Sequence, residues 1–379
     1  MANTLKFGNG QWATKEGSTL AYNDENGNFK PLPFTFDRDT SATRVNKQGL
    51  IEVVSNNEPR IDFKDDSNGA LLLEPSRSNA ITYSNDFTLG GWVSNNVTVT
   101  SNYGTSPDGN LNSTKLIFGS GTAYLNRASG VGVGDQSSSI YVKGISGQIL
   151  KFGKGNNVGG GDNFTLNGEW QRLVHLSTNS GTAFHITSNL GGANATEIEI
   201  YGAQLEQGSY ATSYIPTQGS VVTRDAEVCE QTPPSGIINS SEGSFFLNLI
   251  DIKSQNFDSI TLNDNSGTEN NQVRIWFFNN TVTYQYQVGG SASAQISSTT
   301  IDLSTEVKIS CTWKLNEFKF FVNGIKIGED LSGAVLSSSV LSKINFSRST
   351  FSGVFYGKVK DVRVYNTALT DAELQALTS

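Results

Sequence analysis

The sequence predicts an all-β protein with one short helix at its C-terminal end. Three observations lead to this prediction: apolar and polar residues alternate over several short segments, turn pairs such as Asn-Gly separate these segments, and only 16% of the 379 residues are charged while glycine occurs 39 times. Alternation with period two places one face of a strand in a core. Residues rich in Gly, Asn and Ser favour turns and strands over long helices.

Four turn pairs between alternating segments predict hairpins. Asn-Gly is the strongest of these signals, because both residues tolerate the positive φ that a two-residue hairpin turn requires. In chain order the segments are residues 22–29 around Asn26-Gly27, 45–51 around Gln48-Gly49, 273–278 and 281–286 across Asn279-Asn280, and 318–322 and 325–327 across Asn323-Gly324.

The C-terminal part of the chain holds the clearest single strands and the only convincing helix. Residues 307–313 alternate strictly, so one face of that strand is expected in a core that includes Trp313. A second strand is expected over residues 360–365. Thr370 and Glu373 have the spacing of a capping box, which predicts that a helix starts directly after Thr370.

Composition divides the chain into four regions. Residues 1–84 are dense in turns and too polar to form a large core alone, so an extended attachment region is expected there. Residues 85–217 form a strand-rich block, and residues 237–379 form another of ordinary domain size. Residues 218–236 contain two consecutive prolines, which cannot lie inside a sheet, so a linker is predicted.

Charge and hydropathy exclude several classes of partner. Lys and Arg number 27 against 35 Asp and Glu, a net charge of −8, which disfavours nucleic acid. No apolar run approaches the roughly 20 residues that span a bilayer, so no membrane insertion is expected. The N-terminus has no basic region followed by an apolar stretch, which predicts synthesis and folding in a cytoplasm. Cys229 and Cys311 are then expected to be free thiols.

No catalytic or metal-binding pattern is found. The nearest pair of carboxylates, Glu197 and Glu199, lies on one face of a strand, and a solvated face is favoured over an acid/base pair. His175 and His185 have no Cys or carboxylate at metal spacing, which favours structural or surface roles. The protein is predicted not to be an enzyme and to need no cofactor. Oxygen-rich loops would suit calcium, but none matches an EF-hand, so metal content stays open.

Binding is the remaining function, and aromatic side chains are the residues to consider. Trp276 in the third hairpin shares a face with Arg274 and Gln285, whereas the opposite face is more apolar and is expected to be buried. We hypothesise that Trp276, Arg274 and Gln285 contact a glycan or a protein partner, because aromatic rings stack on sugars while amides bond their hydroxyls. Cover by a neighbouring loop or subunit is an equal alternative. Trp12 is a further candidate, for sugar stacking or for burial against another protein.

The C-terminal block resembles the laminin G-like, concanavalin A-like family. The resemblance implies an antiparallel jelly-roll sandwich that ends with a strand and a helix. Four motifs carry it in order, namely EVKISCTW at 306–313, FFVNG at 320–324, GKVKDVRVYN at 357–366 and LTDAEL at 369–374.

The middle block resembles a galactose-binding-type carbohydrate-binding sandwich. This implies a second antiparallel jelly roll, in which Trp92 and Trp170 are structural. The motifs are Trp92, SIYVK at 139–143, GEWQR at 168–172 and IYGAQLE at 200–206. The predicted fold is therefore two antiparallel jelly-roll sandwiches with an extended N-terminal region and one short C-terminal helix.

The N-terminal region is similar to a segment of bacteriophage virion proteins. The motifs are FTFDR at 34–38, ATRVN at 42–46, GLIE at 49–52, PRIDF at 59–63, LLLEPSRSN at 71–79 and, later, QLEQGSYATSYIPT at 204–217. The resemblance implies a virion protein made in the host cytoplasm, whose N-terminal region contacts other virion proteins. Its place in a tail fibre, a head fibre or a receptor-binding protein stays open.

Three functions follow from these resemblances. Adhesion of a phage particle to surface glycans is favoured. A purely structural role, as a head-decoration or fibre component, is the alternative, and a bacterial carbohydrate-binding protein is the third. Fibre-like phage proteins are often trimers, so the resemblance implies a homotrimer as one option, but no heptad repeat requires one.

Overall fold

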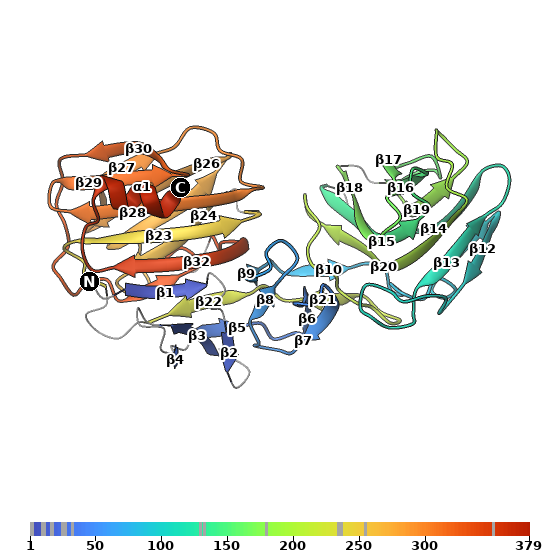
Figure 1. Ribbon diagram of the computed structural model, residues 1–379, viewed down its shortest axis with the longest axis horizontal. Coiled ribbons are helices and arrows are strands. Elements are labelled where there is room, and N and C mark those ends of the chain that lie inside the picture. Colours follow the sequence, from blue (N-terminus) through green and yellow to red (C-terminus); the bar gives the residue numbers. More distant parts are fainter. Residues whose placement is uncertain are drawn as a thin grey trace. The chain divides into compact units, whose positions relative to one another are not determined.

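The computed structural model divides the chain into two compact units (Figure 1). The first unit comprises Met1–Asp39, Asn56–Pro75 and Ala226–Ser379, and the second comprises Thr40–Ser55 and Ser76–Asp225. The structure describes the backbone of strands within residues 4–31 and, in full, residues 34–128, 131, 134–178, 181–232, 238–253, 256–350 and 353–379.

The first unit is a sandwich of two antiparallel sheets. In the described residues one sheet has the order β30 (Ile325–Asp330), β29 (Glu317–Val322), β28 (Glu306–Lys314), β23 (Gly243–Ile250), β32 (Gly357–Tyr365), β9 (Ala70–Leu73) and β8 (Arg60–Asp62), with β1 (Thr4–Gly8) also paired to β32. The other has the order β27 (Ser291–Ser297), β26 (Thr281–Val288), β25 (Gln272–Phe278), β24 (Asn256–Asn263), β31 (Lys343–Asn345), β22 (Val228–Gln231) and β5 (Thr35–Asp37). A small sheet joins β2 (Ala13–Lys15), β3 (Thr19–Asn23) and β4 (Phe29–Pro31).

The core of the first unit forms where the inward faces of its two large sheets meet. Alternate residues of β28 point inward, and Trp313 at its end is fully buried, as predicted. The indole Nε1 of Trp313 donates to the carbonyl of Asn239 at 3.1 Å, so its polar atom is satisfied. Cys229 and Cys311 are both buried free thiols, as expected.

The predicted hairpins are present. Strands β25 and β26 pair across Asn279 and Asn280, whose φ values of 47° and 59° are both positive. Strands β29 and β30 pair across Asn323 and Gly324, with φ values of 48° and 76°. The earlier segments pair as β3 with β4 and as β6 (Ala42–Val45) with β7 (Ile51–Val54). The predicted turn at Asn26-Gly27, between β3 and β4, lies outside the described residues. For the other three hairpins, local turn chemistry was sufficient to predict the connection.

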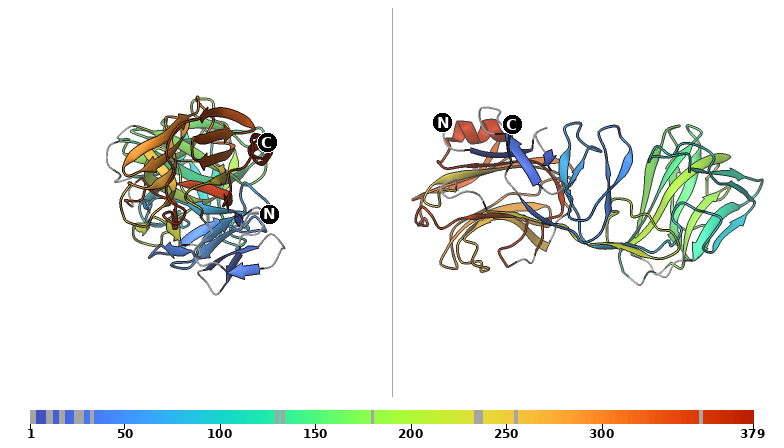
Figure 2. Two further views of the ribbon diagram at one scale, coloured as in Figure 1. Left: turned by 90° about the vertical axis from the view of Figure 1, so that its left-hand side faces the viewer. Right: turned by 90° about the horizontal axis from the view of Figure 1, so that it is seen from below.

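The single helix in the described residues is α1 (Asp371–Thr378). Its capping box forms as predicted: the Thr370 side chain accepts from the Glu373 backbone, and the Glu373 carboxylate accepts from the Thr370 N–H at 2.8 Å. Leu374 is fully buried, and the helix packs on β28 and β29. Figure 2 shows the helix, in red, next to the C-terminal mark. No helix in the described part of the chain is long and apolar enough to cross a membrane.

The second unit is also a sandwich of two antiparallel sheets. In the described residues one sheet has the order β11 (Trp92–Asn95), β14 (Ala123–Ala128), β19 (Ala183–Ser188), β16 (Ile149–Gly155) and β17 (Asp162–Thr165). The other has the order β12 (Val97–Thr100), β13 (Thr114–Phe118), β20 (Glu197–Gln207), β15 (Gln136–Gly144) and β18 (Gln171–Ser177). The hairpin β6–β7 and the pair β10 (Arg77–Asn79) and β21 (Val222–Arg224) complete the unit.

The predicted N-terminal region is not a separate, core-less segment. Strands β5, β8 and β9 join the sheets of the first unit, and Phe34, Ile61 and Leu71 are buried in its core. Residues 40–55 belong to the second unit, where Ile51 packs with two buried tyrosines. The prediction was wrong because it considered only a core formed by this region itself. Its apolar residues are too few for such a core, but they are enough to extend sheets built from distant strands.

The predicted linker over residues 218–236 also contains sheet strands. Within it, β21 pairs with β10, and β22 lies between β31 and β5. The two consecutive prolines lie outside the described residues. The break in pairing predicted from the prolines therefore stays a prediction, and the residues before them form strands because two prolines restrict only their own neighbourhood.

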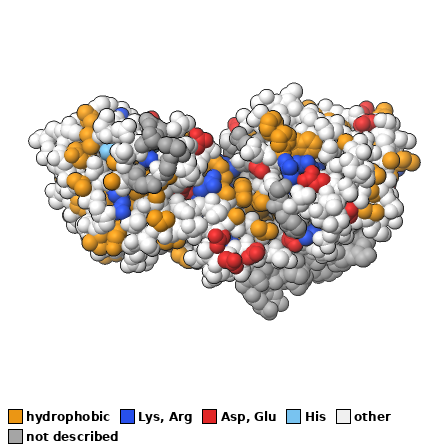
Figure 3. Space-filling model, turned by 180° about the vertical axis from the view of Figure 1, so that it is seen from behind, with side chains coloured by type: hydrophobic (Ala, Val, Ile, Leu, Met, Phe, Trp, Pro, Cys, Tyr) orange, Lys and Arg blue, Asp and Glu red, His pale blue; other side chains and the backbone are white. Residues whose placement is uncertain are grey.

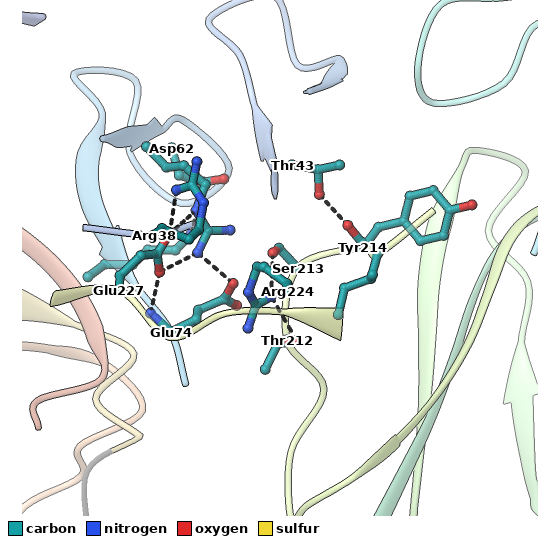
Figure 4. Close-up of polar contacts among 12 residues, drawn as sticks. Arg38, Thr43, Asp62, Glu74, Thr212, Ser213, Tyr214, Arg224 and Glu227 are labelled. Atoms are coloured by element: carbon teal, nitrogen blue, oxygen red, sulfur yellow. Dashed lines mark hydrogen bonds and ion pairs between the residues drawn. The ribbon is translucent and has the colours of Figure 1, made fainter. Parts of the chain in front are cut away.

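A buried ionic cluster holds the joined segments of the first unit together (Figure 4). Glu227 accepts from Arg38 at 2.9 Å and from Arg60 at 2.5 and 2.6 Å, and all three side chains are fully buried. Arg60 also pairs with Glu74 at 2.9 Å. Burial alone would lower the pKa of Arg60, but the two carboxylates raise it above the ordinary arginine value.

The second unit has a separate polar cluster, also drawn in Figure 4. The guanidinium of Arg224 donates to Thr212 at 3.2 Å and to Ser213 at 3.0 Å, and the Thr43 hydroxyl donates to the carbonyl of Tyr214 at 2.5 Å. These hydroxyl and carbonyl partners tie residues 40–55 and β21 to the segment that follows β20. The segment around Thr43 is therefore part of the second unit's packing and not a free arm.

Candidate functional site

The third predicted hairpin presents the two faces that its sequence implies. Ile275 and Phe277 of β25 and Tyr284 of β26 are fully buried in the core. On the opposite face Trp276 and Gln285 are partly exposed. The prediction that Trp276 and Gln285 lie on the wetter side of the hairpin is confirmed, whereas their role in binding stays a prediction.

Arg274 is placed differently from the exposed contact residue that we expected. Its side chain is almost completely buried, and it donates to the Ser259 hydroxyl at 2.8 Å and to the carbonyl of Phe257 at 3.0 Å. Its guanidinium carbon lies 4.7 Å from the centre of the Trp276 ring. Burial, together with nearby Arg348, lowers the pKa of Arg274 to about 10 against the opposing effect of Glu269. Arg274 therefore supports the indole of Trp276 from inside the protein.

Amide and hydroxyl side chains continue this face across β26 and β27. Gln285 donates to the Gln295 side-chain oxygen at 3.0 Å, and Thr283 donates to Ser297 at 2.9 Å. Thr283 is the direct cross-strand neighbour of Trp276. An aromatic ring bordered by amides and hydroxyls is suited to a ligand that offers both apolar faces and hydroxyl groups.

Two further aromatic rings and an arginine extend the site, and sequence reasoning missed them as contacts. Phe257 stacks on Phe278 with ring centres 4.3 Å apart and planes 13° apart. Phe257 is 42% exposed and has a positive φ of 59° at a register shift of β24. The guanidinium of Arg348 lies over its ring, 5.9 Å from the centre. Phe278 could have been found from its alternation with Trp276, but Phe257 and Arg348 carry no local signal.

We call Trp276, Phe257, Phe278, Arg348 and Gln285 the Trp276 surface. The other predicted contact residue, Trp12, lies outside the described residues.

Figure 3 shows that one face of the molecule consists mainly of uncharged polar side chains and backbone, with acidic and basic side chains in small groups. Charge over that face is therefore not gathered into one continuous patch.

The two structural tryptophans of the middle block are only half buried. Trp92 packs on Phe184 with ring centres 5.8 Å apart, and its Nε1 donates to the Tyr83 carbonyl at 3.1 Å. Trp170 donates to the carbonyl of Thr105 at 3.1 Å. Each indole N–H thus has a partner within the second unit, in keeping with a structural role.

The carboxylate pair of β20 forms ordinary polar contacts. Glu197 pairs with Lys115 at 3.1 Å, and Glu199 accepts from the Ser113 hydroxyl at 2.6 Å. Both residues are partly exposed on one face of the strand, as predicted. Within the described ranges, no group of three His, Cys, Asp or Glu side chains could hold a metal ion.

Comparisons with solved structures gave similarities of low identity. The CBM40 of the Ruminococcus gnavus IT-sialidase, bound to α2,3-sialyllactose, is 17% identical over 37% of this chain and 84% of its own, with a TM-score of 0.31. Domain 4 of AbnA, an extracellular arabinanase of Geobacillus stearothermophilus in complex with arabinotriose, is 14% identical over 46% of this chain and 84% of its own, with a TM-score of 0.34. The heptameric SAP-like pentraxin of Limulus polyphemus is 15% identical over 40% of this chain and 82% of its own, with a TM-score of 0.28.

A search of curated proteins found no match. A family model does match the part of the chain that carries the Trp276 surface. This match agrees with the laminin G-like resemblance of the C-terminal motifs and with the sandwich observed there. Residues 244–375 match the model of the concanavalin A-like lectin/glucanases superfamily.

Proposed function

We propose that the protein is a glycan-binding adhesin of a bacteriophage virion and that its first unit binds sugar at the Trp276 surface. The observation that carries the glycan part is the position of Trp276: a partly exposed indole, supported by buried Arg274 and bordered by amides, within a region that matches a lectin and glucanase family. The virion part is supported by the resemblance of the N-terminal motifs to phage virion proteins.

The proposed contacts follow from the chemistry of the surface. A pyranose ring has an apolar face of C–H groups that can stack on the indole of Trp276. The amide of Gln285 and the guanidinium of Arg348 can bond hydroxyl groups around that ring. Because Arg274 is already held by Ser259 and Phe257, Trp276 is oriented before a ligand arrives, which reduces the ordering cost of binding.

The test is binding of the purified, labelled full chain to intact candidate host cells, with and without competing surface polysaccharide. Saturable binding that the polysaccharide abolishes, and that falls about tenfold or more in Trp276→Ala, is the expected result. Tyr103→Ala is the matched control, because Tyr103 is an exposed aromatic of the second unit at 49% exposure. It should bind as the unchanged protein does.

Two results would contradict the proposal. Unchanged binding of Trp276→Ala to every cell and polysaccharide would remove the Trp276 surface as the glycan site. Absence of binding to any cell that the phage infects would favour the alternative, a virion structural protein whose sandwiches pack against other virion components.

A further inference from the structure

A pocket of about 780 Å³ opens at one end of the second unit's sandwich. Its lining comes from the ends of β15, β16 and β18 and from the loop that follows β16. Gln136, Lys154 and His175 are buried residues of this lining, and Asn157, Ser177 and Ser209 also line the pocket. None of these residues belongs to the Trp276 surface, so the pocket is a separate feature of the molecule.

The strands that form the pocket change from apolar to polar at inward-facing positions. On β16 the inward position after fully buried Phe152 is Lys154, and on β18 the inward position after Leu173 is His175. The alternation of the strands continues, so these polar side chains occupy the sandwich interior rather than its outer surface. This is the reverse of what a core requires, because burying polar and charged groups costs free energy.

Lys154 is the decisive residue. Its side chain is buried, with the residue 4% exposed, and its ammonium donates to the side-chain oxygen of Gln136. Among the described residues, no carboxylate lies within ion-pairing distance of it, and residues 129–133 and 179–180 contain no Asp or Glu. Burial lowers the pKa of Lys154. The ammonium group thus has a neutral partner and no counter-charge.

Two hydroxyl groups on the strands that form the pocket have no partner. The hydroxyl oxygen of Ser177, which lines the pocket, and that of Ser138, two residues after Gln136 on β15, are buried and have no hydrogen-bond partner among the described residues. Buried polar groups are normally bonded, and groups left unpaired at a cavity point to a missing ligand or water. His175 differs, because its Nδ1 lies 2.8 Å from the carboxylate of Asp162.

The glycine-rich loop after β16 builds one wall of the pocket. An added Cβ at Gly155 would lie 2.8 Å from the Cα of Gly160, and one at Gly153 would lie 2.6 Å from the His175 ring. Side chains at these positions would push the loop and the imidazole away. The glycines therefore have a use in this chain, which is to let the backbone fold closely against the strand that carries Lys154.

We infer that this pocket binds a sugar that carries a carboxylate, such as a uronic or sialic acid residue, with the carboxylate paired to Lys154. A single buried cation matches a single carboxylate, and the surrounding amides and hydroxyls match sugar hydroxyls. Nucleic acid or a polyacidic peptide would need several cations. The carboxylates of Asp135, at the exposed rim, and Asp162, bonded to His175, would disfavour a ligand of higher charge.

The chain offers a local reporter for this binding. Its only two histidines are His175, which lines the pocket, and His185, whose Nε2 lies 3.3 Å from the carbonyl of Gly155. Imidazole resonances of the full chain should therefore be followed by NMR while trigalacturonate or 3′-sialyllactose is added. We expect at least one acidic sugar to shift the His175 resonance saturably, whereas lactose and methyl-esterified trigalacturonate do not.

Calorimetric titration of variants completes the test. Lys154→Met should weaken binding of the acidic sugar at least tenfold, Lys154→Arg should retain part of it, and Asp135→Asn should tighten it a few-fold. Trp276→Ala should leave this binding unchanged, which separates the pocket from the proposed adhesin surface.

Several results would overturn the inference. Equal binding of the acidic sugar and its methyl ester would overturn it. Unchanged affinity of a folded Lys154→Met variant for the acidic sugar would also overturn it. Binding of inorganic phosphate as tightly as the sugar would assign a general anion site instead. Failure of every acidic sugar to shift either histidine of the unchanged protein at millimolar concentration would exclude a sugar-acid site.

Discussion

Arg60 in the first unit and Lys154 in the second are both buried cations, but their surroundings differ. Arg60 contacts two carboxylates, Glu227 at 2.5 Å and Glu74 at 2.9 Å. Among the described residues, the ammonium group of Lys154 is hydrogen-bonded to the neutral amide of Gln136 and forms no ion pair. Arg60 lies where three chain segments join, whereas Lys154 is a buried residue in the lining of a pocket.

The difference shows how a buried charge can be assigned a role. A cation that the protein itself compensates stabilises the packing of the segments that supply its partners, and removing one partner leaves an uncompensated charge. A cation without a counter-charge destabilises the free protein, so its retention in a pocket favours a ligand that supplies the missing charge. The predictions below test this assignment.

The largest effect is expected for Glu227→Gln. This change leaves both Arg38 and Arg60 buried with less counter-charge, and the free energy of unfolding of the first unit should fall by about 3–5 kcal/mol. Urea denaturation of the full chain measures it. Glu329→Gln is the control, because the exposed pair of Glu329 with Lys326 should contribute less than about 1 kcal/mol. Equal effects of the two variants would contradict a structural role for the cluster.

A direct comparison uses two buried lysines. Lys358 of β32 is paired with Asp62 at 2.6 Å and with Asp65, whereas Lys154 has no such partner among the described residues. Lys358→Met should destabilise the first unit by about 3 kcal/mol, since it removes the cation that pairs with the buried carboxylate of Asp62. Lys154→Met should leave the second unit unchanged or more stable. Thermal unfolding measures both, and a large loss in Lys154→Met would mean that Lys154 is structural.

Alkaline pH should separate the two lysines as well. Because burial lowers the pKa of Lys154 below its ordinary value of 10.5, the unfolded chain holds this proton more tightly, and stability should rise as the pH increases toward 10.5. The pKa of Lys358 is raised by Asp62 and Asp65 against the effect of burial, so its contribution is lost only above 10.5. Urea denaturation followed by the NMR resonances of the two histidines measures the stability of the second unit. The rise of this stability with pH should be absent in Lys154→Met.

The smallest effect is expected for Ser138→Ala. The hydroxyl of Ser138 has no partner in the described residues, so its removal should cost less than about 0.5 kcal/mol. Ser84→Ala is the matched change at a satisfied site: the Ser84 hydroxyl contacts the Tyr214 hydroxyl at 2.6 Å and accepts from the Thr217 N–H at 2.9 Å. Removing it should cost about 1–2 kcal/mol by urea denaturation. The reverse order would mean that Ser138 is bonded in the free protein.

The sequence predicted part of the candidate surface and none of the pocket. Alternation placed Trp276 and Gln285 on the correct face because the two faces of a strand depend only on neighbouring residues. Phe257 and Arg348 lie 91 positions apart, and the register shift that exposes Phe257 has no local signal. The alternation along β16 places Lys154 on the inward face. Lysine side chains are usually exposed, however, so the sequence alone does not predict a buried lysine at this position.

Local chemistry was enough to predict the all-β class, the hairpin turns and the capped C-terminal helix. Asn323 and Gly324 have the positive φ values that their hairpin turn requires. Thr370 and Glu373 form the capping box at the start of the helix. Which sheets the N-terminal strands β5 and β9 join was decided only by the tertiary structure. Strand β5 pairs with β22, and β9 pairs with β32, across separations that no turn residue encodes. Pairing at that distance depends on which sheet edges are left open and on the combined burial of many apolar side chains, which is a property of the whole chain.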